Sequence, residues 1–566
     1  MDYRQNYEQW LNSEFIDSEL KEEIKNIRDD KEIEDRFYKN LEFGTGGLRG
    51  IMGAGINRMN IHTVGKATQG LSDYLLDKYK GDKISVSIAY DSRNNSEKFA
   101  KEAARIFCAN GIVVNLFDSL RPTPMLSFTI RYLNCKAGVV VTASHNPKEY
   151  NGYKVYGEDG GQITDNNAEK IISYINKIED FSVIKRIDYD EAKEKGLLNI
   201  IGGDVDREYF SNVKNLTIRK ELVEEHAKDL KIIYTPLHGS GNIPVRRVLS
   251  ELGYENLSVV KEQELPDGNF PTVSYPNPEE KEVFNYALNM AKSLKPDIIF
   301  GTDPDCDRIG VVIKDSTGEY RTLTGNQTGI LLTNYIVTSM KEMEKLSDKD
   351  VVVKTIVSTD MVRKILDEYG VELIEVLTGF KYIGEKIKEF KQTGDKSFLF
   401  GFEESYGYLA GDFVRDKDAV IAAVLICEMT LYYKNKGMSL YEALVELYEK
   451  YGYYKEELVS IKLEGKEGRE KITKVLEYFR TNIGSEINGV NIINKKDYIA
   501  GIENLPKSNV LKFILEDNSW FVVRPSGTEP KMKIYFSVTG ESNDDAEMRL
   551  KKFKNNIINI VEDIIK

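Results

Sequence analysis

The sequence predicts an α/β fold divided into several domains. Apolar runs of strand length, such as residues 139–141 and 298–300, end in polar loops, and stretches with helical periodicity lie between them. At 566 residues the chain is too long for one hydrophobic core, and its length corresponds to roughly four domains. From about residue 510 the pattern changes to strictly alternating strands, which indicates a different, α+β unit at the C-terminal end.

The composition is typical of a soluble globular protein, with 41% hydrophobic and 30% charged residues. No apolar run approaches the ~18 residues that a membrane span needs, and the longest, 419–427, predicts a buried helix. The first residues contain no apolar segment, so secretion is not indicated. Four cysteines lie far apart and form no CxxC pair, so we expect reduced, mostly buried thiols in a cytoplasmic protein: Cys108, Cys135, Cys306 and Cys427.

The net charge argues against a nucleic-acid or membrane partner. Lys and Arg total 78 and Asp and Glu total 91, which gives a formal charge of −13. Any phosphate site must therefore be local, with clustered cationic groups and backbone N–H groups that overcome a repulsive global field.

The chain begins with a helical lead-in followed by a glycine-rich segment. Residues 1–40 alternate charged and apolar residues at helical spacing. The segment 43–50 is not a dinucleotide fingerprint, because Arg49 stands where a glycine is required, and it is not a P-loop, because no G-K-[ST] follows. A glycine loop that presents Arg49 suits an anion contact, and a plain turn is the alternative.

Ser144 follows a predicted strand. A strand over 84–89, a helix over 96–110 and a strand over 112–116 set a βαβ rhythm that continues to the valine run 139–141. This run ends in T-A-S-H-N-P, and proline cannot continue a strand ladder. Ser144 therefore falls on the loop at the carboxyl end of a strand, where open α/β sheets place ligands.

Three interpretations of Ser144 remain to be weighed. An isolated serine at such a place is most simply part of a turn that closes the strand. A protease nucleophile is disfavoured because no G-x-S-x-G elbow surrounds it. The third interpretation is a carrier that holds a phosphoryl group and passes it on, which requires a metal, a phosphate clamp and a polyol-binding loop elsewhere in the chain.

The residues after Ser144 predict a return strand and a helix. Lys154 follows soon enough to reach the same site, and an exposed strand lysine is the alternative. Thr164 or Asp165 caps a helix whose apolar positions share one face. Composition turns polar around 201–204, which marks a first domain boundary. His238, at the end of the next strand, is expected to be a hydrogen-bonded structural histidine.

Three aspartates at alternate positions follow the next buried strand: Asp303, Asp305 and Asp307. Held between the apolar strands 298–300 and 309–313, they repel one another unless a cation is present. An EF-hand is excluded, because Arg308 and Lys314 occupy the positions of its glycine and glutamate. Three carboxylates leave room for water or a phosphate oxygen, which suits Mg²⁺ better than calcium, and a solvated acidic turn is the alternative.

A third α/β unit runs from about residue 326 to 450 and carries two notable loops, 378–381 and 401–407. Adjacent carboxylates and a serine at the end of strand 397–400 suit hydrogen bonding to vicinal sugar hydroxyls. An acidic helix entry is the alternative. The R-D-K-D segment 415–418 precedes the predicted buried helix.

The last unit contains a hairpin of strands 510–515 and 520–523 and ends in an amphipathic helix. The loop 524–530 combines an arginine, two hydroxyls and a glycine, which together make an anion nest for phosphate. The strand that follows places four apolar residues on one face: Met532, Ile534, Phe536 and Val538.

With these loops together, the sequence resembles the α-D-phosphohexomutase superfamily over essentially the whole chain. The four signature loops stand in the family's order: 142–147, 303–308, 401–405 and 524–530. The resemblance implies three similar α/β domains with mixed sheets and a smaller α+β C-terminal domain, with one loop from each meeting in a central cleft. The domains expected are 1–208, 209–323, 324–450 and 451–566.

The resemblance also implies roles for individual residues. The serine matching Ser144 carries the phosphoryl group and, with Asp303, Asp305 and Asp307, holds Mg²⁺. His145, Arg49, Lys154 and Lys417 are expected to take part in catalysis, with Lys154 and Lys417 as candidate general acid/base, for which a depressed pKa is required. The substrate-binding residues expected are Arg308, Thr378, Gly379, Glu403, Ser405, Arg524, Ser526, Gly527 and Thr528.

The reaction implied is the interconversion of glucose 1-phosphate and glucose 6-phosphate through glucose 1,6-bisphosphate. The form G-F-E-E-S and the chain's length resemble the bacterial phosphoglucomutase branch, which is related to phosphoglucomutase-2 and phosphopentomutase. Phe402 and Cys306 stand where many members have glycine, so mannose and pentose phosphates are alternative substrates.

Two rival functions use the same loops. A phosphatase would pass the phosphoryl group to water, and an inactive relative would only bind sugar phosphates. The partners expected are small-molecule sugar phosphates, with no nucleic acid and no membrane, and the protein is expected to be a monomer or weak homodimer.

Overall fold

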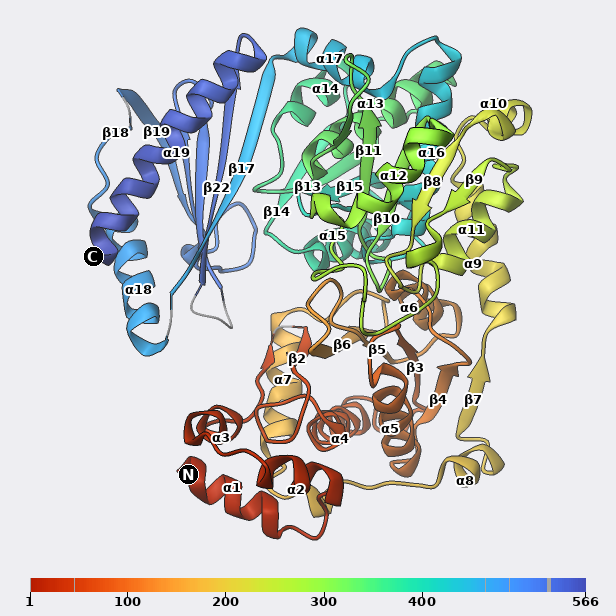
Figure 1. The fold of residues 1–566 in the computed structure, drawn as a ribbon, viewed down its shortest axis with the longest axis vertical. Helices are drawn as coiled ribbons and strands as arrows, with labels where there is room; N and C mark the ends of the chain where they lie inside the picture. Colours follow the sequence, from red (N-terminus) through yellow and green to blue (C-terminus); the bar gives the residue numbers. More distant parts are fainter. Residues whose placement is uncertain (1, 45, 464, 488, 527–530) are drawn as a thin grey trace.

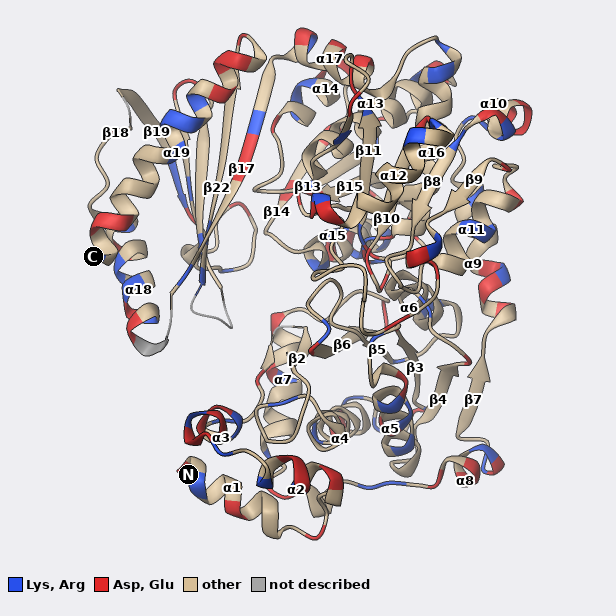
Figure 2. Cartoon of the chain, in the orientation of Figure 1, with Lys and Arg blue, Asp and Glu red and all other residues tan. Residues whose placement is uncertain are grey.

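A computed structural model describes residues 2–44, 46–463, 465–487, 489–526 and 531–566, and Figure 1 shows its ribbon. Its strands form four sheets, and the strands of each sheet come from one continuous stretch of chain. Figure 2 shows Lys and Arg interspersed with Asp and Glu on the outer helices, whereas the central strands carry few charges. Within the described residues, no helix has both the length and the apolar character that crossing a membrane requires.

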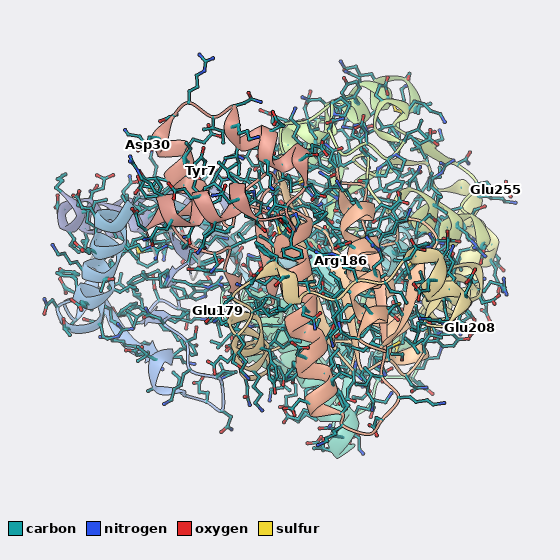
Figure 3. All side chains as sticks on the ribbon, turned by 90° about the horizontal axis from the view of Figure 1, so that it is seen from below. Tyr7, Asp30, Glu179, Arg186, Glu208 and Glu255 are labelled. Carbon is teal, nitrogen blue, oxygen red and sulfur yellow. The ribbon has the colours of Figure 1, made fainter. Side chains whose placement is uncertain are left out.

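The lead-in is helical, as predicted. It consists of α1 (Tyr3–Asn12), α2 (Ser18–Lys25) and α3 (Asp30–Phe37). Trp10, Ile24 and Phe37 are buried between these helices and form a small core of their own. Figure 3 shows Tyr7 and Asp30 on the side of the molecule formed by these helices, far from Glu208 and Glu255.

The first sheet is mixed, with strand order β1-β2-β6-β5-β3-β4-β7. β3, β4, β5 and β7 run parallel, whereas β6 pairs antiparallel with β5 and β2. The predicted strands and helices are confirmed, with ends that differ by one or two residues. The strands are β1 (Phe43–Gly44), β2 (Gly47–Ile51), β3 (Ser85–Tyr90), β4 (Val113–Phe117), β5 (Ala137–Val141), β6 (Tyr150–Gly157) and β7 (Leu198–Ile201). The helices are α4 (Ile61–Lys78), α5 (Ser96–Ala109), α6 (Thr123–Tyr132), α7 (Asp165–Asn176), η1 (Phe181–Val183) and α8 (Tyr189–Glu194).

The glycine-rich segment corrects the prediction of a loop at 43–50. It forms the β1–β2 hairpin, and β2 pairs along β6. Gly47 has φ of 141°, and a Cβ there would lie 1.9 Å from the Tyr153 carbonyl oxygen. The glycines therefore permit close strand pairing. The sequence did not reveal this, because a strand rich in glycine has neither apolar alternation nor β-branched residues.

The second sheet has strand order β12-β11-β10-β8-β9, with β8, β9 and β10 parallel and β11 antiparallel to β10. Its strands are β8 (Ile232–Thr235), β9 (Leu257–Val259), β10 (Ile298–Thr302), β11 (Ile309–Lys314) and β12 (Tyr320–Thr322). The helices are α9 (Gly203–Asn215), α10 (Lys220–His226), η2 (Ala227–Asp229), α11 (Asn242–Glu251), η3 (Lys261–Gln263), η4 (Lys281–Phe284) and α12 (Asn285–Leu294).

The third sheet repeats this plan, with order β14-β13-β15-β16 and only β16 antiparallel. Its strands are β13 (Asp350–Thr355), β14 (Glu372–Val376), β15 (Ser397–Glu403) and β16 (Gly407–Ala410). The helices are α13 (Gly325–Glu342), α14 (Met361–Tyr369), α15 (Phe380–Thr393), α16 (Ala419–Asn435) and α17 (Leu440–Tyr451). The predicted buried helix is confirmed, since α16 is buried throughout residues 419–433 and packs against α11, α9 and β10.

The fourth sheet is entirely antiparallel, with order β17-β22-β21-β20-β19-β18. Its strands are β17 (Tyr453–Lys462), β18 (Glu486–Ile487), β19 (Val490–Asp497), β20 (Leu511–Leu515), β21 (Trp520–Pro525) and β22 (Lys531–Gly540), and its helices are α18 (Gly465–Thr481), η5 (Tyr498–Ala500) and α19 (Asn543–Ile565). The alternation predicted for β22 is confirmed, because Met532, Ile534, Phe536 and Val538 are all buried in the core under α19.

Two minor expectations are also confirmed. All four cysteines are buried and none forms a disulfide. His238 is buried, with Nδ1 3.1 Å from the Leu265 carbonyl oxygen and Nε2 2.9 Å from Thr272 Oγ1, as expected of a structural histidine.

Candidate active site

The first three sheets present a loop at the same topological position. In each, the loop joins a strand of the parallel set to the antiparallel strand that follows it: β5 to β6, β10 to β11 and β15 to β16. Each loop contains one non-glycine residue in the left-handed region, namely Ser144 and Cys306 (both φ 52°) and Tyr406 (φ 65°). Such conformations are costly and persist where the surrounding structure holds them. A glycine would adopt the conformation of Cys306 at lower cost.

The serine loop brings Ser144 onto the aspartates, although 159 residues separate Ser144 from Asp303. Ser144 Oγ donates to Asp303 Oδ2 at 2.7 Å and lies 3.1 Å from His145 Nδ1. The Ser144 N–H donates to Thr142 Oγ1 at 2.8 Å, which fixes the turn. The serine hydroxyl is thus buried against a carboxylate from the second sheet, a contact that a plain strand-closing turn does not require.

Arg93 holds the serine loop, and the sequence prediction missed it. Its guanidinium donates to the carbonyl oxygens of Ser144 (2.5 Å), Pro147 (2.9 Å) and Tyr150 (3.2 Å), as well as to that of Asn146. Asp91 accepts from Thr142 Oγ1 at 2.6 Å and from the Arg93 N–H at 3.0 Å. Asp91 and Arg93 both follow β3, which pairs with β5. A pair of opposite charges at the end of that strand is the sequence signal that could have identified them as loop-holding residues.

We expect Arg93→Met to lower any turnover that depends on the Ser144 hydroxyl by about 10²-fold, because the Ser144 carbonyl would lose its donor and the hydroxyl would shift. Exposed Arg207, replaced by Met, is the control for loss of one positive charge. Steady-state kinetics of both purified variants check this, and an unchanged turnover number in Arg93→Met would contradict the positioning role.

The three aspartates are fully buried and close together. Each offers a carboxylate oxygen, and these oxygens lie within 4.8 Å of one another. Asp303 Oδ1 accepts the N–H groups of Asp307 (3.1 Å) and Arg308 (3.0 Å). Asp307 Oδ2 pairs with Lys417 Nζ, but among the described residues no hydrogen bond reaches Asp305 Oδ1 or Asp307 Oδ1. These orphaned oxygens fit a hard cation, and the alternative of a solvated acidic turn is wrong.

The charges of the cluster shift its members in opposite directions. Burial, together with the charges of Asp305 and Asp307, raises the pKa of Asp303 well above its usual value. Burial opposes ionisation of Asp305 as well, but the ammonium of Lys154 outweighs it and holds the pKa of Asp305 below its usual range. Three buried carboxylates this close together cannot all be ionised unless cations balance their negative charge.

Two lysines provide part of that balance. Lys154 Nζ lies 2.8 Å from Asp305 Oδ2, and Lys417 Nζ lies 2.8 Å from Asp307 Oδ2. Although burial opposes it, these carboxylates raise the pKa of both lysines. The shift has the opposite sign to the one a general base needs, so both side chains are protonated at neutral pH. Lys154 is largely buried, and the alternative of an exposed strand lysine is wrong.

His145 and Arg49 complete the surroundings of the serine. Burial, and then the charges of Arg308 and Arg49, lower the pKa of His145 well below its usual value, so its ring is neutral. Arg49 is exposed on β2, and its Nη1 donates to Asn146 Oδ1 at 3.3 Å. The hairpin therefore places Arg49 beside the serine loop.

The third loop corrects two predictions. Glu403 is the last residue of β15 rather than a loop residue, and the chain turns directly into β16, so no acidic helix entry exists. The Phe402 side chain is completely buried, stacked on Phe400 and packed against Gly329, so it is a core residue.

Glu403 and Ser405 interact with one another beside the aspartate cluster. The charges of Lys417 and Arg308 and the Ser405 hydroxyl all favour the ionised form of the Glu403 carboxylate. Burial is the largest influence and raises the pKa of Glu403. Arg308 Nη1 in turn donates to Glu279 Oε1 at 2.6 Å.

Glu404 and Thr378 are two further polar residues of the third unit. The sequence prediction grouped Glu404 with Glu403 as adjacent carboxylates suited to sugar hydroxyls, and the Glu404 carboxylate accepts from Thr355 Oγ1 at 3.0 Å. Burial and the charge of Glu403 raise the pKa of Glu404 to about 7. Thr378 Oγ1 is buried with no hydrogen bond among the described residues, and Gly379 has φ of 121° at the start of α15.

Of the predicted phosphate loop, the structure describes the beginning only. Arg524 lies on β21 and Ser526 follows it, with its N–H donating to the Lys531 carbonyl at 2.7 Å. Gly527 and Thr528 lie outside the described residues.

Lys533 stands directly opposite Arg524 in the β21–β22 register. Burial and the charge of Arg524 lower the pKa of Lys533, and the carboxylate of Glu404 also acts on it. Two adjacent cations facing the third unit suit an anion. The sequence prediction missed Lys533, although its alternation with Met532 and Ile534 was the signal.

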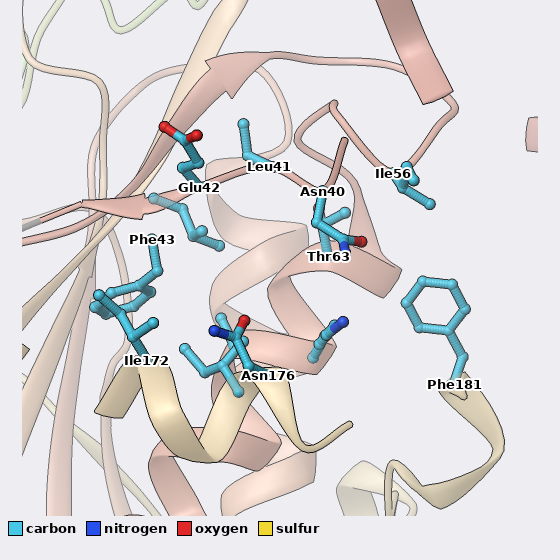
Figure 4. A pocket seen from close by; sticks show the side chains of 13 residues that line it. Asn40, Leu41, Glu42, Phe43, Ile56, Thr63, Ile172, Asn176 and Phe181 are labelled. Atoms are coloured by element: carbon cyan, nitrogen blue, oxygen red, sulfur yellow. The ribbon is translucent and has the colours of Figure 1, made fainter. Parts of the chain in front are cut away.

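A cavity of about 170 Å³ lies away from this site, among the segment 40–43, α4 and α7. Figure 4 shows Asn40, Thr63, Asn176 and Phe181 around it. None of the predicted site residues lines it, so it is separate from the chemistry described above.

Comparison with known families gives matches over most of the chain. Four domain descriptions of phosphoglucomutase/phosphomannomutase match in order: alpha/beta/alpha domain I at residues 40–181, alpha/beta/alpha domain II at 207–318, alpha/beta/alpha domain III at 324–451 and the C-terminal domain at 459–552.

Curated relatives and solved structures agree with these matches. The chain is 35% identical over 561 residues to a phosphoglucomutase of Staphylococcus saprophyticus (97% of this chain, 99% of the relative) and 38% identical over 516 residues to one of Staphylococcus haemolyticus (89% and 91%). A phosphoglucomutase from Paramecium in an open form superposes with a TM-score of 0.70 at 19% identity (93% and 95% covered). A phosphoglucomutase/phosphomannomutase family protein from Burkholderia thailandensis gives 0.67 at 18% (92% and 97%). At these identities the structures show a shared fold.

Proposed function

The chain belongs to the phosphoglucomutase/phosphomannomutase family, and on that premise we propose that it interconverts glucose 1-phosphate and glucose 6-phosphate by way of a phosphoserine at Ser144. It is an intramolecular phosphotransferase of the isomerase class and acts in carbohydrate metabolism. The observation that carries the assignment to Ser144 is its hydroxyl, 2.7 Å from Asp303 within a cluster of three buried carboxylates.

The reaction consists of two phosphoryl transfers. Phospho-Ser144 gives its phosphoryl group to the free hydroxyl of a hexose phosphate: the bond between Oγ and phosphorus breaks, and a new bond from phosphorus to the sugar oxygen forms. The sugar oxygen loses its proton, and the released Ser144 Oγ takes up a proton in exchange. The resulting glucose 1,6-bisphosphate turns end over end. Ser144 then takes the other phosphoryl group and the product departs. Positioning and charge stabilisation supply most of the catalysis in such transfers.

The metal site is assigned to Asp303, Asp305 and Asp307 together with the phosphate on Ser144. The orphaned carboxylate oxygens of the cluster support this assignment. A bound Mg²⁺ would neutralise negative charge on the phosphoryl group and reduce the repulsion among the carboxylates.

The polar groups around Ser144 have separate roles in orienting the hydroxyl, stabilising charge and transferring protons. His145, whose Nδ1 lies 3.1 Å from Ser144 Oγ, is a supporting contact that orients the serine hydroxyl. Lys154 and Lys417, both protonated, and Arg49 stabilise the phosphoryl charge, and either lysine can return a proton as a general acid.

Substrate contacts fall to the third and fourth loops. Glu403 and Ser405 hydrogen-bond the sugar hydroxyls, with Arg308, Thr378 and Gly379 beside them. The phosphate that does not react is held by Arg524, Ser526, Gly527 and Thr528, and the position of Lys533 opposite Arg524 adds a further cation.

We also propose the domain boundaries, the cellular location, the oligomeric state and the activator. The chain divides into domains 1–208, 209–323, 324–450 and 451–566. The protein works in the cytoplasm as a monomer or weak homodimer, and glucose 1,6-bisphosphate activates it by phosphorylating Ser144.

The direct test is an assay of the purified protein with Mg²⁺, glucose 1-phosphate and a trace of glucose 1,6-bisphosphate, with mannose 1-phosphate and ribose 1-phosphate in parallel. We expect rapid formation of glucose 6-phosphate that stops on addition of EDTA, with no release of inorganic phosphate. Preference for mannose or ribose would move the function to that sugar. Phosphate release in place of isomerisation would identify a phosphatase.

A further inference from the structure

Lys512 is a buried lysine that the proposed chemistry does not use. It lies on β20 of domain IV (451–566), and its exposed fraction is 3%. Its Nζ donates to the Ile356 carbonyl of domain III (324–450) at 2.7 Å and lies 4.5 Å from the centre of the Trp520 ring. Burial lowers the pKa of Lys512 to about 8, so the ammonium stays mostly charged at pH 7. Lys512 is thus a cationic hydrogen-bond donor between two domains.

The turn that accepts this hydrogen bond is held in place from within domain III. It follows β13, and the fully buried Lys354 near the end of that strand donates to the Ser358 carbonyl at 3.1 Å. Lys354 is itself paired with Asp360 at 2.9 Å and with Glu375 at 2.8 Å. The turn therefore offers domain IV an acceptor at a fixed place.

The same turn also contacts the sugar-binding loop. Thr355 Oγ1 donates to Glu404 Oε2 at 3.0 Å, and Ser358 Oγ lies 3.4 Å from the same oxygen. Glu404 directly follows Glu403, which is proposed to hydrogen-bond the sugar hydroxyls. The turn 355–358 thus connects the contact with domain IV to the sugar end of the site.

Lys512 also belongs to the sheet that carries the phosphate end of the site. It stands opposite Val522 in the register between β20 and β21. β21 begins at Trp520, beside the Lys512 ammonium, and its last residue but one is Arg524. A shift of Lys512 relative to domain III would therefore move Arg524 relative to the sugar-binding loop.

Apolar packing between the two domains does not by itself fix this distance. The interface includes buried apolar side chains of both domains, among them Val357 and Leu377 of domain III and Tyr498 and Val522 of domain IV. Apolar burial is non-directional, so these surfaces can tilt or slide at little cost. A hydrogen bond from an ammonium to a carbonyl is directional and is lost when its atoms separate. The Lys512 hydrogen bond therefore selects one of the arrangements that the apolar contacts allow.

We propose that Lys512 is a positioning residue that fixes the phosphate-binding strand β21 at a set distance from the sugar-binding residues Glu403 and Ser405. This inference rests on the proposed function. The phosphate that does not react makes the same contacts in the ground state and in the transition state, so its misplacement weakens the binding of both equally. Lys512 should therefore affect KM and leave kcat nearly unchanged.

The first experiment measures steady-state kinetics of the full chain with Mg²⁺ and glucose 1-phosphate. Lys512→Met keeps the apolar stem but loses the donor, and we expect its KM to rise about 10-fold while kcat changes by less than about twofold. Lys512→Arg keeps a cationic donor, and its KM should stay within about threefold of the wild-type value. Exposed Lys552→Met is the control for loss of one positive charge from domain IV. A fall in kcat without a rise in KM, or equal kinetics in Lys512→Met and Lys552→Met, would overturn the proposal.

The second experiment measures the distance between the domains without substrate. All four native cysteines are buried, so spin labels can be attached selectively to cysteines introduced at exposed positions by Glu389→Cys on α15 and Lys551→Cys on α19. Double electron–electron resonance then gives the distribution of label distances. Lys512→Met is expected to broaden this distribution about twofold, whereas Lys552→Met leaves it unchanged. A distribution as narrow in Lys512→Met as in the wild type would overturn the proposal.

The two experiments distinguish failure of this inference from failure of the proposed function. A broadened distribution in a protein that turns over no glucose phosphate would support the positioning role and reject the proposed substrate. If Lys512→Met fails to fold, Lys512→Gln decides the question in both experiments, because its shorter side chain ends before the Ile356 carbonyl.

Discussion

Replacing Ser144 by alanine is expected to lower mutase turnover by about 10⁴-fold or more, because the variant has no hydroxyl to carry the phosphoryl group. The fold should persist, since the change removes one oxygen atom from a loop that Arg93 and Thr142 still hold. The measurements are coupled formation of glucose 6-phosphate and intact mass after incubation with glucose 1,6-bisphosphate. The wild-type protein should gain the mass of one phosphoryl group, and the variant should gain none.

Ser72→Ala is a matched control for Ser144→Ala. Ser72 is also a buried serine of the first α/β unit, and its hydroxyl donates within α4 to the Thr68 carbonyl at 2.8 Å. This variant should keep its activity and become phosphorylated. Full turnover in Ser144→Ala would refute the phosphoserine mechanism, and phosphorylation of the Ser144→Ala protein would show that another residue is the carrier.

Asp303→Asn should abolish magnesium-dependent activity without destabilising the metal-free protein. The variant lacks one carboxylate of the proposed metal site and the acceptor charge beside Ser144, and we expect turnover to fall by about 10³-fold or more. In the metal-free state the same change removes one negative charge from three buried carboxylates. The measurements are kinetics with Mg²⁺ and thermal unfolding with and without Mg²⁺.

The pH dependence of stability separates the loss of the metal site from the removal of a buried negative charge in the metal-free protein. The pKa of Asp303 is higher in the folded than in the unfolded protein, so its protonation favours folding at low pH. This contribution is lost as pH rises from the unfolded pKa, about 3.9, through the folded pKa. Metal-free Asp303→Asn should therefore be more stable than the wild type at neutral pH and should not show this loss.

Exposed Glu319, replaced by Gln, serves as the control for loss of one negative charge from the same unit. It should keep both activity and the rise in melting temperature that Mg²⁺ produces. An Asp303→Asn protein that is still stabilised by Mg²⁺ to the wild-type extent would place the ion elsewhere. A metal-free variant less stable than the wild type at neutral pH would show that the carboxylate is stabilising without the ion.

Local sequence patterns determined the α/β class, the order of the four loops and most of the elements. The valine run before Ser144, the aspartates between two apolar strands and the alternation of β22 each depend on residues close together in the chain. Strand ends, turns and buried faces follow from such short-range preferences. For the same reason the sequence alone predicted Ser144 and the three aspartates as site residues, but not the distance between them.

Only the tertiary structure decided which distant residues meet. It placed Arg93 on the serine loop, Lys533 opposite Arg524, Arg49 on a strand rather than a loop, and Phe402 in the core. It also showed that the pKa values of Lys154 and Lys417 are raised rather than lowered. Registers between strands, contacts between domains and pKa values depend on burial and on charges contributed by other parts of the chain. No window of the sequence contains those neighbours, so the packed structure alone fixes them.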